Sequence, residues 1–87
     1  MELEQSFKSF SESVQNLVRR PSNEELLKLY GLFKQATEGD VLEERPGGFD
    51  FKAFAKYDAW ESQKGKSKDA AMAEYIELAK ELIAKYS

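Results

Sequence analysis

The most informative part of the chain is residues 26–40, which read LLKLYGLFKQATEGD. Apolar side chains recur there at every third or fourth position, a spacing that predicts an amphipathic α-helix rather than a strand. Just before this stretch, Ser22 and Glu25 match a capping box, in which the side chain of each residue accepts a hydrogen bond from the backbone N–H of the other. Gly39 is suited to closing the helix at its far end. We therefore expect a helix over residues 22–38.

Three more segments with the same apolar periodicity predict three more helices. These are expected near residues 3–18, 51–64 and 67–86. Asp50 and Ser67 are suitable N-cap residues for the last two. Residues 40–50 contain Pro46 and two glycines and are expected to form an irregular connection, long for a small bundle. With neither strand alternation nor an internal repeat, the chain is predicted to be one all-α domain over residues 1–87, built as a four-helix bundle.

The size and composition of the chain limit what it can do. Its 87 residues suit one small domain, and 41% hydrophobic with 33% charged residues is a normal globular balance. The net charge of −3 argues against a nucleic-acid partner, which would need a basic surface. No apolar run approaches the roughly 20 residues of a membrane span, and the first residues do not resemble a secretory signal. We expect a cytoplasmic protein without an integral membrane segment.

Catalysis is difficult to build from these residues. The chain has no histidine and no cysteine, so the commonest general base, the thiolate nucleophile and the usual zinc ligands are missing. Adjacent carboxylates such as Glu24 and Glu25 do not face each other on a helix and are expected to be solvated. The glycines form no phosphate-binding loop. The sequence therefore predicts a protein that is not an enzyme and holds no metal or cofactor.

One helical face combines aromatic rings with lysines. Tyr30, Phe33 and Lys34 lie at i, i+3 and i+4, so they share a face of the second helix. By the same rule Lys52 and Lys56 share a face of the third. Such a surface suits a nucleotide, because a ring stacks on the base and ammonium groups meet the phosphates. From the spacing alone, the alternative also stands that the rings belong to the core and the lysines are solvated.

The sequence of residues 26–40 strongly resembles the signature of acyl-CoA-binding proteins. In that signature a tyrosine, two residues and an aromatic residue precede Lys-Gln-Ala-Thr, one residue and Gly-Asp, here from Tyr30 to Asp40. Further matching segments are found at residues 44–47, 56–60, 64–67, 70–76 and 84–87. The resemblance covers essentially the whole chain without an insertion.

This resemblance implies both a fold and a function. The fold would be an up-down-down-up four-helix bundle with a long connection between helices 2 and 3. The protein would bind long-chain acyl-CoA thioesters non-covalently, as a monomeric intracellular carrier and buffer for lipid metabolism. Enzymes that produce or consume acyl-CoA would be its partners. The alternative is a helical protein–protein interaction domain that keeps this fold without binding the ligand.

The resemblance also implies roles for residues at the head group of the ligand. Tyr30, Lys34 and Lys56 would hold the 3′-phosphate of the CoA ribose. Phe33 would stack on the adenine, and Tyr75 would close the head-group site from the fourth helix.

The groove for the acyl chain would be lined by Leu26, Leu27 and Ala55. The chain departs from the family pattern in three places, one of which is Tyr57, where a tryptophan is frequent. Phe33 stands where tyrosine is usual, which keeps the ring and loses the hydroxyl. Gln15 stands where several members have a lysine, so we leave it out of the expected site.

Overall fold

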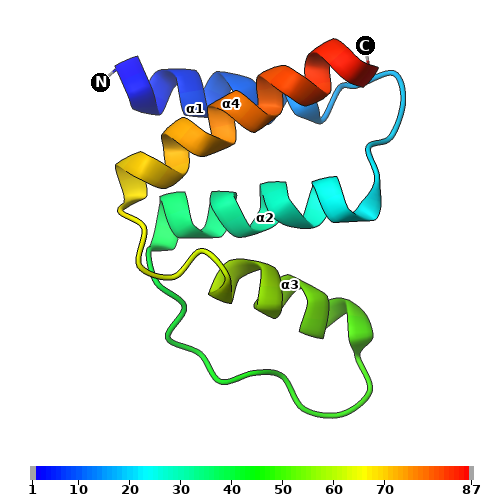
Figure 1. The fold of residues 1–87 in the computed structure, drawn as a ribbon, viewed down its shortest axis with the longest axis vertical. Coiled ribbons are helices and arrows are strands. Elements are labelled where there is room, and N and C mark those ends of the chain that lie inside the picture. The colour runs from blue at the N-terminus through cyan, green and yellow to red at the C-terminus, as the bar shows by residue number, and fades with distance from the viewer. Residues whose placement is uncertain (1, 87) are drawn as a thin grey trace.

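The computed structural model describes residues 2–86 and contains four helices (Figure 1). They are α1 (Glu2–Val14), α2 (Asn23–Glu38), α3 (Phe51–Glu61) and α4 (Lys68–Tyr86). No strand occurs among the described residues, so the predicted all-α class is confirmed. None of these helices is both long and apolar enough to cross a membrane.

The helices have the predicted up-down-down-up order. In Figure 1, α1 and α4 run in one direction, while α2 and α3 run in the other. Within the described chain, α4 packs against α1 and α2, and α3 packs against α2 alone. Because α2 and α3 are parallel, residues 39–50 must return along the whole length of α3, which explains the long connection.

The predicted caps fix where three helices begin. The Ser22 hydroxyl accepts a hydrogen bond from the Glu25 amide, and the Glu25 carboxylate accepts one from the Ser22 amide, which completes the capping box of α2. Asp50 accepts from the amide of Ala53 at the start of α3, and Ser67 accepts from that of Ala70 at the start of α4.

Two helices end earlier than expected. Helix α1 stops at Val14 instead of residue 18, because the Asn16 side chain donates to the Glu12 carbonyl, the acceptor that a continuing helix would use for the Asn16 amide. The Asn16 amide instead bonds to the Ser13 carbonyl in a tighter turn. Helix α3 ends at Glu61 instead of residue 64, and the chain then turns through Gly65, whose φ of 98° favours glycine.

The main core lies where α1, α2 and α4 meet. Its buried side chains include Phe7, Leu32, Tyr75 and Leu82. Helix α3 joins this unit through α2, at Gly31. A Cβ atom there would lie 2.2 Å from the carbonyl oxygen of Ala59, so only glycine lets the two backbones approach this closely.

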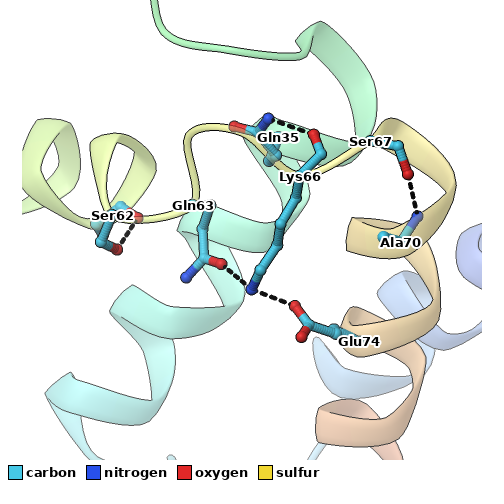
Figure 2. Close-up of polar contacts among 8 residues, drawn as sticks. Gln35, Ser62, Gln63, Lys66, Ser67, Ala70 and Glu74 are labelled. Atoms are coloured by element: carbon cyan, nitrogen blue, oxygen red, sulfur yellow. Dashed lines mark hydrogen bonds and ion pairs between the residues drawn. The ribbon is translucent and has the colours of Figure 1, made fainter.

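Polar contacts anchor the loops at one end of the bundle. The fully buried Gln35 amide nitrogen donates to the Asp40 carboxylate and to the Lys66 carbonyl, both at 2.8 Å. Figure 2 shows the Gln35–Lys66 contact and the Lys66 ammonium group between Gln63 and Glu74. These bonds tie the end of α2 to the segment that leads into α4.

Candidate ligand-binding site

A hollow with a volume of about 540 Å³ lies between the first halves of α2 and α3. We call it the apolar hollow. Its lining residues are Arg20, Asn23, Leu26, Leu27, Tyr30, Phe51, Lys52, Ala55 and Lys56. The charged members are all basic. Leu27 lies next to Leu26, and Ala55 lies one turn after Phe51, so both helices present apolar side chains to the same space.

A second hollow of about 220 Å³ adjoins the first, and we call it the lysine hollow. Its lining residues are Tyr30, Lys34, Glu43, Pro46, Ala53, Lys56, Tyr57 and Trp60. The two hollows share Tyr30 and Lys56. An apolar space therefore joins directly to a space with two lysines.

The two lysines of this hollow reach it from different helices. The Lys56 ammonium lies over the Tyr30 ring, 5.4 Å from its centroid. The Lys34 ammonium lies over the Trp60 ring at 4.8 Å and pairs with Glu38. The hydrogen bond with Glu38 is the main cause that raises the pKa of Lys34, so this group is charged at neutral pH. Two ammonium groups beside aromatic rings can bind an anion, with one carboxylate, that of Glu43, also in the lining.

Phe33 of α2 and Tyr75 of α4 line neither of these two hollows. The Phe33 ring stacks on Phe7 at a centroid distance of 5.6 Å and lies 6.2 Å from Tyr75. Of these three residues only Phe33 is substantially exposed, at 39%. Phe33 is therefore neither a fully buried core residue nor a lining residue of the two hollows.

Tyr75 is only 4% exposed and lines a third hollow, of about 500 Å³, with Gln15 and Leu26. Burial raises the pKa of Tyr75 to about 12, so its hydroxyl stays protonated. This hydroxyl forms no hydrogen bond with any other residue of the range 2–86. Arg20 and Leu26 line both this hollow and the apolar hollow, so the two spaces are neighbours.

The structure brings most of the predicted site residues together. Leu26, Leu27 and Ala55 line the apolar hollow, while Lys34 lines the lysine hollow. Tyr30 and Lys56 line both, as described above, and Phe33 and Tyr75 lie apart.

Sequence reasoning missed Arg20, Asn23 and Phe51, and it left Lys52 undecided. All four line the apolar hollow. Lys52 and Phe51 could have been found from helical spacing, because each lies one turn before a predicted site residue. Arg20 could not, because it lies in the turn before α2 and only the folded chain places it here. Within residues 2–86 no cluster of acidic side chains could hold a metal ion.

Comparison with known proteins gives the family of this chain. Residues 4–79 match the model of the family described as acyl-CoA-binding protein. The chain belongs to the acyl-CoA-binding protein family. It is 52% identical over 81 residues to acyl-CoA-binding protein homolog 1 of Caenorhabditis elegans, covering 93% of this chain and 94% of the relative. It is 51% identical over 83 residues to an acyl-CoA-binding protein of Brassica napus, covering 95% and 90%.

Solved structures of this family have the same fold. The crystal structure of acyl-CoA-binding protein 2 from Oryza sativa superposes with a TM-score of 0.91 at 47% identity, covering 95% of this chain and 92% of the other. The solution structure of the yeast acyl-coenzyme A binding protein has a TM-score of 0.76 at 51% identity, covering 95% and 96%. The four-helix arrangement of this chain is thus that of the acyl-CoA-binding proteins.

Proposed function

We propose that this acyl-CoA-binding protein binds long-chain acyl-CoA thioesters non-covalently and acts as an intracellular carrier and buffer for them. The observation that supports this best is the junction of the apolar hollow with the lysine hollow at Tyr30 and Lys56. An acyl-CoA has the same division, with an apolar tail at one end and phosphates at the other. A surface that offers both environments side by side suits such a ligand.

The head group would be held mainly by the lysine hollow. We assign the 3′-phosphate to Tyr30, Lys34 and Lys56, because the two ammonium groups and the phenol lie around one space. Each charge-assisted hydrogen bond would contribute about 1.5–3 kcal/mol. Phe33 would stack on the adenine through its exposed surface, and the Tyr75 hydroxyl would donate to the head group from α4.

The acyl chain would lie in the apolar hollow against Leu26, Leu27 and Ala55. Each methylene removed from water there would contribute up to about 0.8 kcal/mol. Phe51, which is 74% exposed, would cover part of the tail at the edge of this hollow. Enclosed in this way, the tail would be kept from aggregating and the thioester would be shielded from water.

Binding without catalysis is the activity we propose. The chain belongs to a family of binding proteins, and it has neither a histidine nor a cysteine to act as base or nucleophile. We place the protein in the cytoplasm as a monomer, where it would receive acyl-CoA from enzymes that form it and deliver it to enzymes that use it.

Parallel titrations with palmitoyl-CoA, free CoA and palmitate test the proposal. Palmitoyl-CoA should bind far more tightly than either part, because only the whole ligand uses both hollows. Along a series of acyl-CoAs the affinity should rise with chain length until the apolar hollow is full. Equal affinity for acetyl-CoA and palmitoyl-CoA would contradict this assignment. Binding of none of these ligands would favour the alternative of an interaction domain.

A further inference from the structure

Glu38 forms an ion pair with Lys34, one of the two lysines of the lysine hollow. Lys34 lies one helical turn earlier on α2. The Lys34 side chain is largely covered, with 23% of its surface exposed, whereas the Glu38 side chain is about half exposed. The Lys34 ammonium group also lies over the ring of Trp60, 4.8 Å from its centroid.

Lys56 differs from Lys34 in this respect. Its ammonium group lies over the Tyr30 ring and forms no ion pair within the described residues 2–86. The same hollow therefore contains one lysine that is open to an incoming anion and one that is already paired. An anion that uses both lysines must share the Lys34 ammonium group with Glu38 or displace Glu38 from it.

The position of Glu38 on its helix adds to the energetic cost of losing the contact with Lys34. Glu38 is the last residue of α2, where the helix carries a partial negative charge that disfavours a carboxylate. The contact with Lys34 offsets that unfavourable position. When a phosphate takes Lys34, Glu38 loses its partner and is left beside both the helix end and the phosphate.

We propose that Glu38 is an internal competitor for the phosphate at Lys34 and lowers the affinity of the site for its ligand. This inference rests on the proposed function. In the empty protein Glu38 keeps the ammonium group of Lys34 at the lysine hollow. On binding it gives up Lys34, and the loss of this pair weakens retention of the ligand, which suits a carrier that must also release it.

The test compares wild-type protein with Glu38→Gln, which removes the charge and keeps the side-chain length. Each is titrated with palmitoyl-CoA and with palmitoyl-3′-dephospho-CoA. We expect Glu38→Gln to bind palmitoyl-CoA about two- to fivefold more tightly, the range that corresponds to one partly exposed ion pair. The gain should be smaller for the dephospho ligand, because that ligand has no 3′-phosphate to place at Lys34.

Glu74→Gln is the matched control. Glu74 pairs with Lys66 on a part of the surface outside both hollows, so its substitution also removes one negative charge and one ion pair. An affinity of Glu38→Gln equal to or below that of wild type would overturn the inference and leave the proposed function intact. An equal gain in Glu74→Gln would overturn it as well, by showing a general charge effect. No binding by wild type would overturn the proposed function itself.

Discussion

At the scale of single residues, the site depends on side chains that the core does not need. Lys34 and Lys56 approach the lysine hollow from two helices, and both lie over aromatic rings rather than inside the main core. Phe33 also remains partly exposed, supported by the buried ring of Phe7. Side chains of this kind can change binding without changing the fold, which makes the residue roles testable one at a time.

Substitution of either lysine should reduce binding more than stability. We expect Lys34→Ala and Lys56→Ala each to weaken palmitoyl-CoA binding by about 1.5–3 kcal/mol, the value of a charge-assisted hydrogen bond. Unfolding free energies should change far less, because neither lysine belongs to the core cluster. Titration calorimetry and denaturant unfolding measure the two effects. The same loss of affinity for the 3′-dephospho ligand would show that the phosphate is assigned wrongly.

Phe33 should act as a platform for the adenine. Phe33→Tyr keeps the ring and should keep or slightly improve affinity, while Phe33→Ala should lose about 1–3 kcal/mol of binding. Because Phe33 is 39% exposed, we expect the tyrosine hydroxyl to reach water and not to destabilise the fold. Melting curves of the ligand-free variants serve as the control. A large drop in Tm for both variants, with affinity unchanged, would instead make Phe33 a core residue.

Gly31 should be essential for the contact between α2 and α3. Gly31→Ala improves helix propensity by about 1 kcal/mol, yet its Cβ would meet the Ala59 backbone at 2.2 Å. Backbone cannot move aside as a flexible side chain can, so we expect a net destabilisation of about 1–3 kcal/mol. Gly47→Ala is the control, since nothing lies within 4 Å of a Cβ at that position. Equal stability of the two variants in urea unfolding would refute the close-contact argument.

At the scale of helices, the end of α4 secures the beginning of α2. The Glu25 carboxylate of the capping box also accepts hydrogen bonds from the Tyr86 hydroxyl at 2.5 Å and from the Lys85 ammonium at 3.1 Å. The guanidinium group of Arg19 donates to the Lys85 carbonyl from the turn between α1 and α2. One carboxylate thus caps a helix and fastens another to it.

This arrangement predicts a loss of stability in acid. The Tyr86 hydrogen bond, followed by the Ser22 backbone, lowers the pKa of Glu25 from 4.5 to about 2. A lowered pKa in the folded state means that the stabilisation is complete above pH 4.5 and is lost as the pH falls towards 2. Tyr86→Phe should reduce this pH dependence and move the acid-unfolding midpoint upward. Acid titration followed by circular dichroism measures it, and an unchanged midpoint would show that Tyr86 does not act on Glu25.

At the scale of the whole molecule, the bundle consists of a three-helix unit, α1, α2 and α4, and of helix α3, which packs on that unit. Helices α1, α2 and α4 share the main core, whereas α3 packs against α2 alone within residues 2–86 (Figure 1). The Trp60 indole adds a hydrogen bond to the Gly39 carbonyl at 2.8 Å, and Arg45 of the long connection binds Asp58 through two nitrogens. Both hollows of the site lie between the three-helix unit and α3.

Hydrogen exchange should therefore be uneven across the protein. Without ligand, amides of α3 should exchange faster than those of α4, because fewer buried contacts oppose local opening of α3. Palmitoyl-CoA should slow exchange in α3 more than in α1, since the ligand would bridge α2 and α3. Mass spectrometry of exchanged peptides measures this difference. A uniform increase in protection across all four helices would argue against binding between α2 and α3.

The sequence by itself determined the features that depend on neighbours within about four residues. The capping box at Ser22, the caps at Asp50 and Ser67, and the number of helices all follow from local hydrogen bonds and apolar periodicity. The face shared by Tyr30 and Lys34 follows from helical spacing in the same way. The long irregular connection over residues 40–50 follows from its proline and glycines. The resemblance to the family supplied the helix order.

Only the tertiary structure decided the features that depend on segments far apart in the chain. It places Arg20 at the apolar hollow and separates Phe33 and Tyr75 from both hollows that Tyr30 lines. It also explains Gly31. A glycine inside a helix lowers helix propensity, but here it is required because the Ala59 backbone lies too close for a Cβ atom. These features arise from packing between helices, and no local pattern encodes which side chains a distant helix will cover.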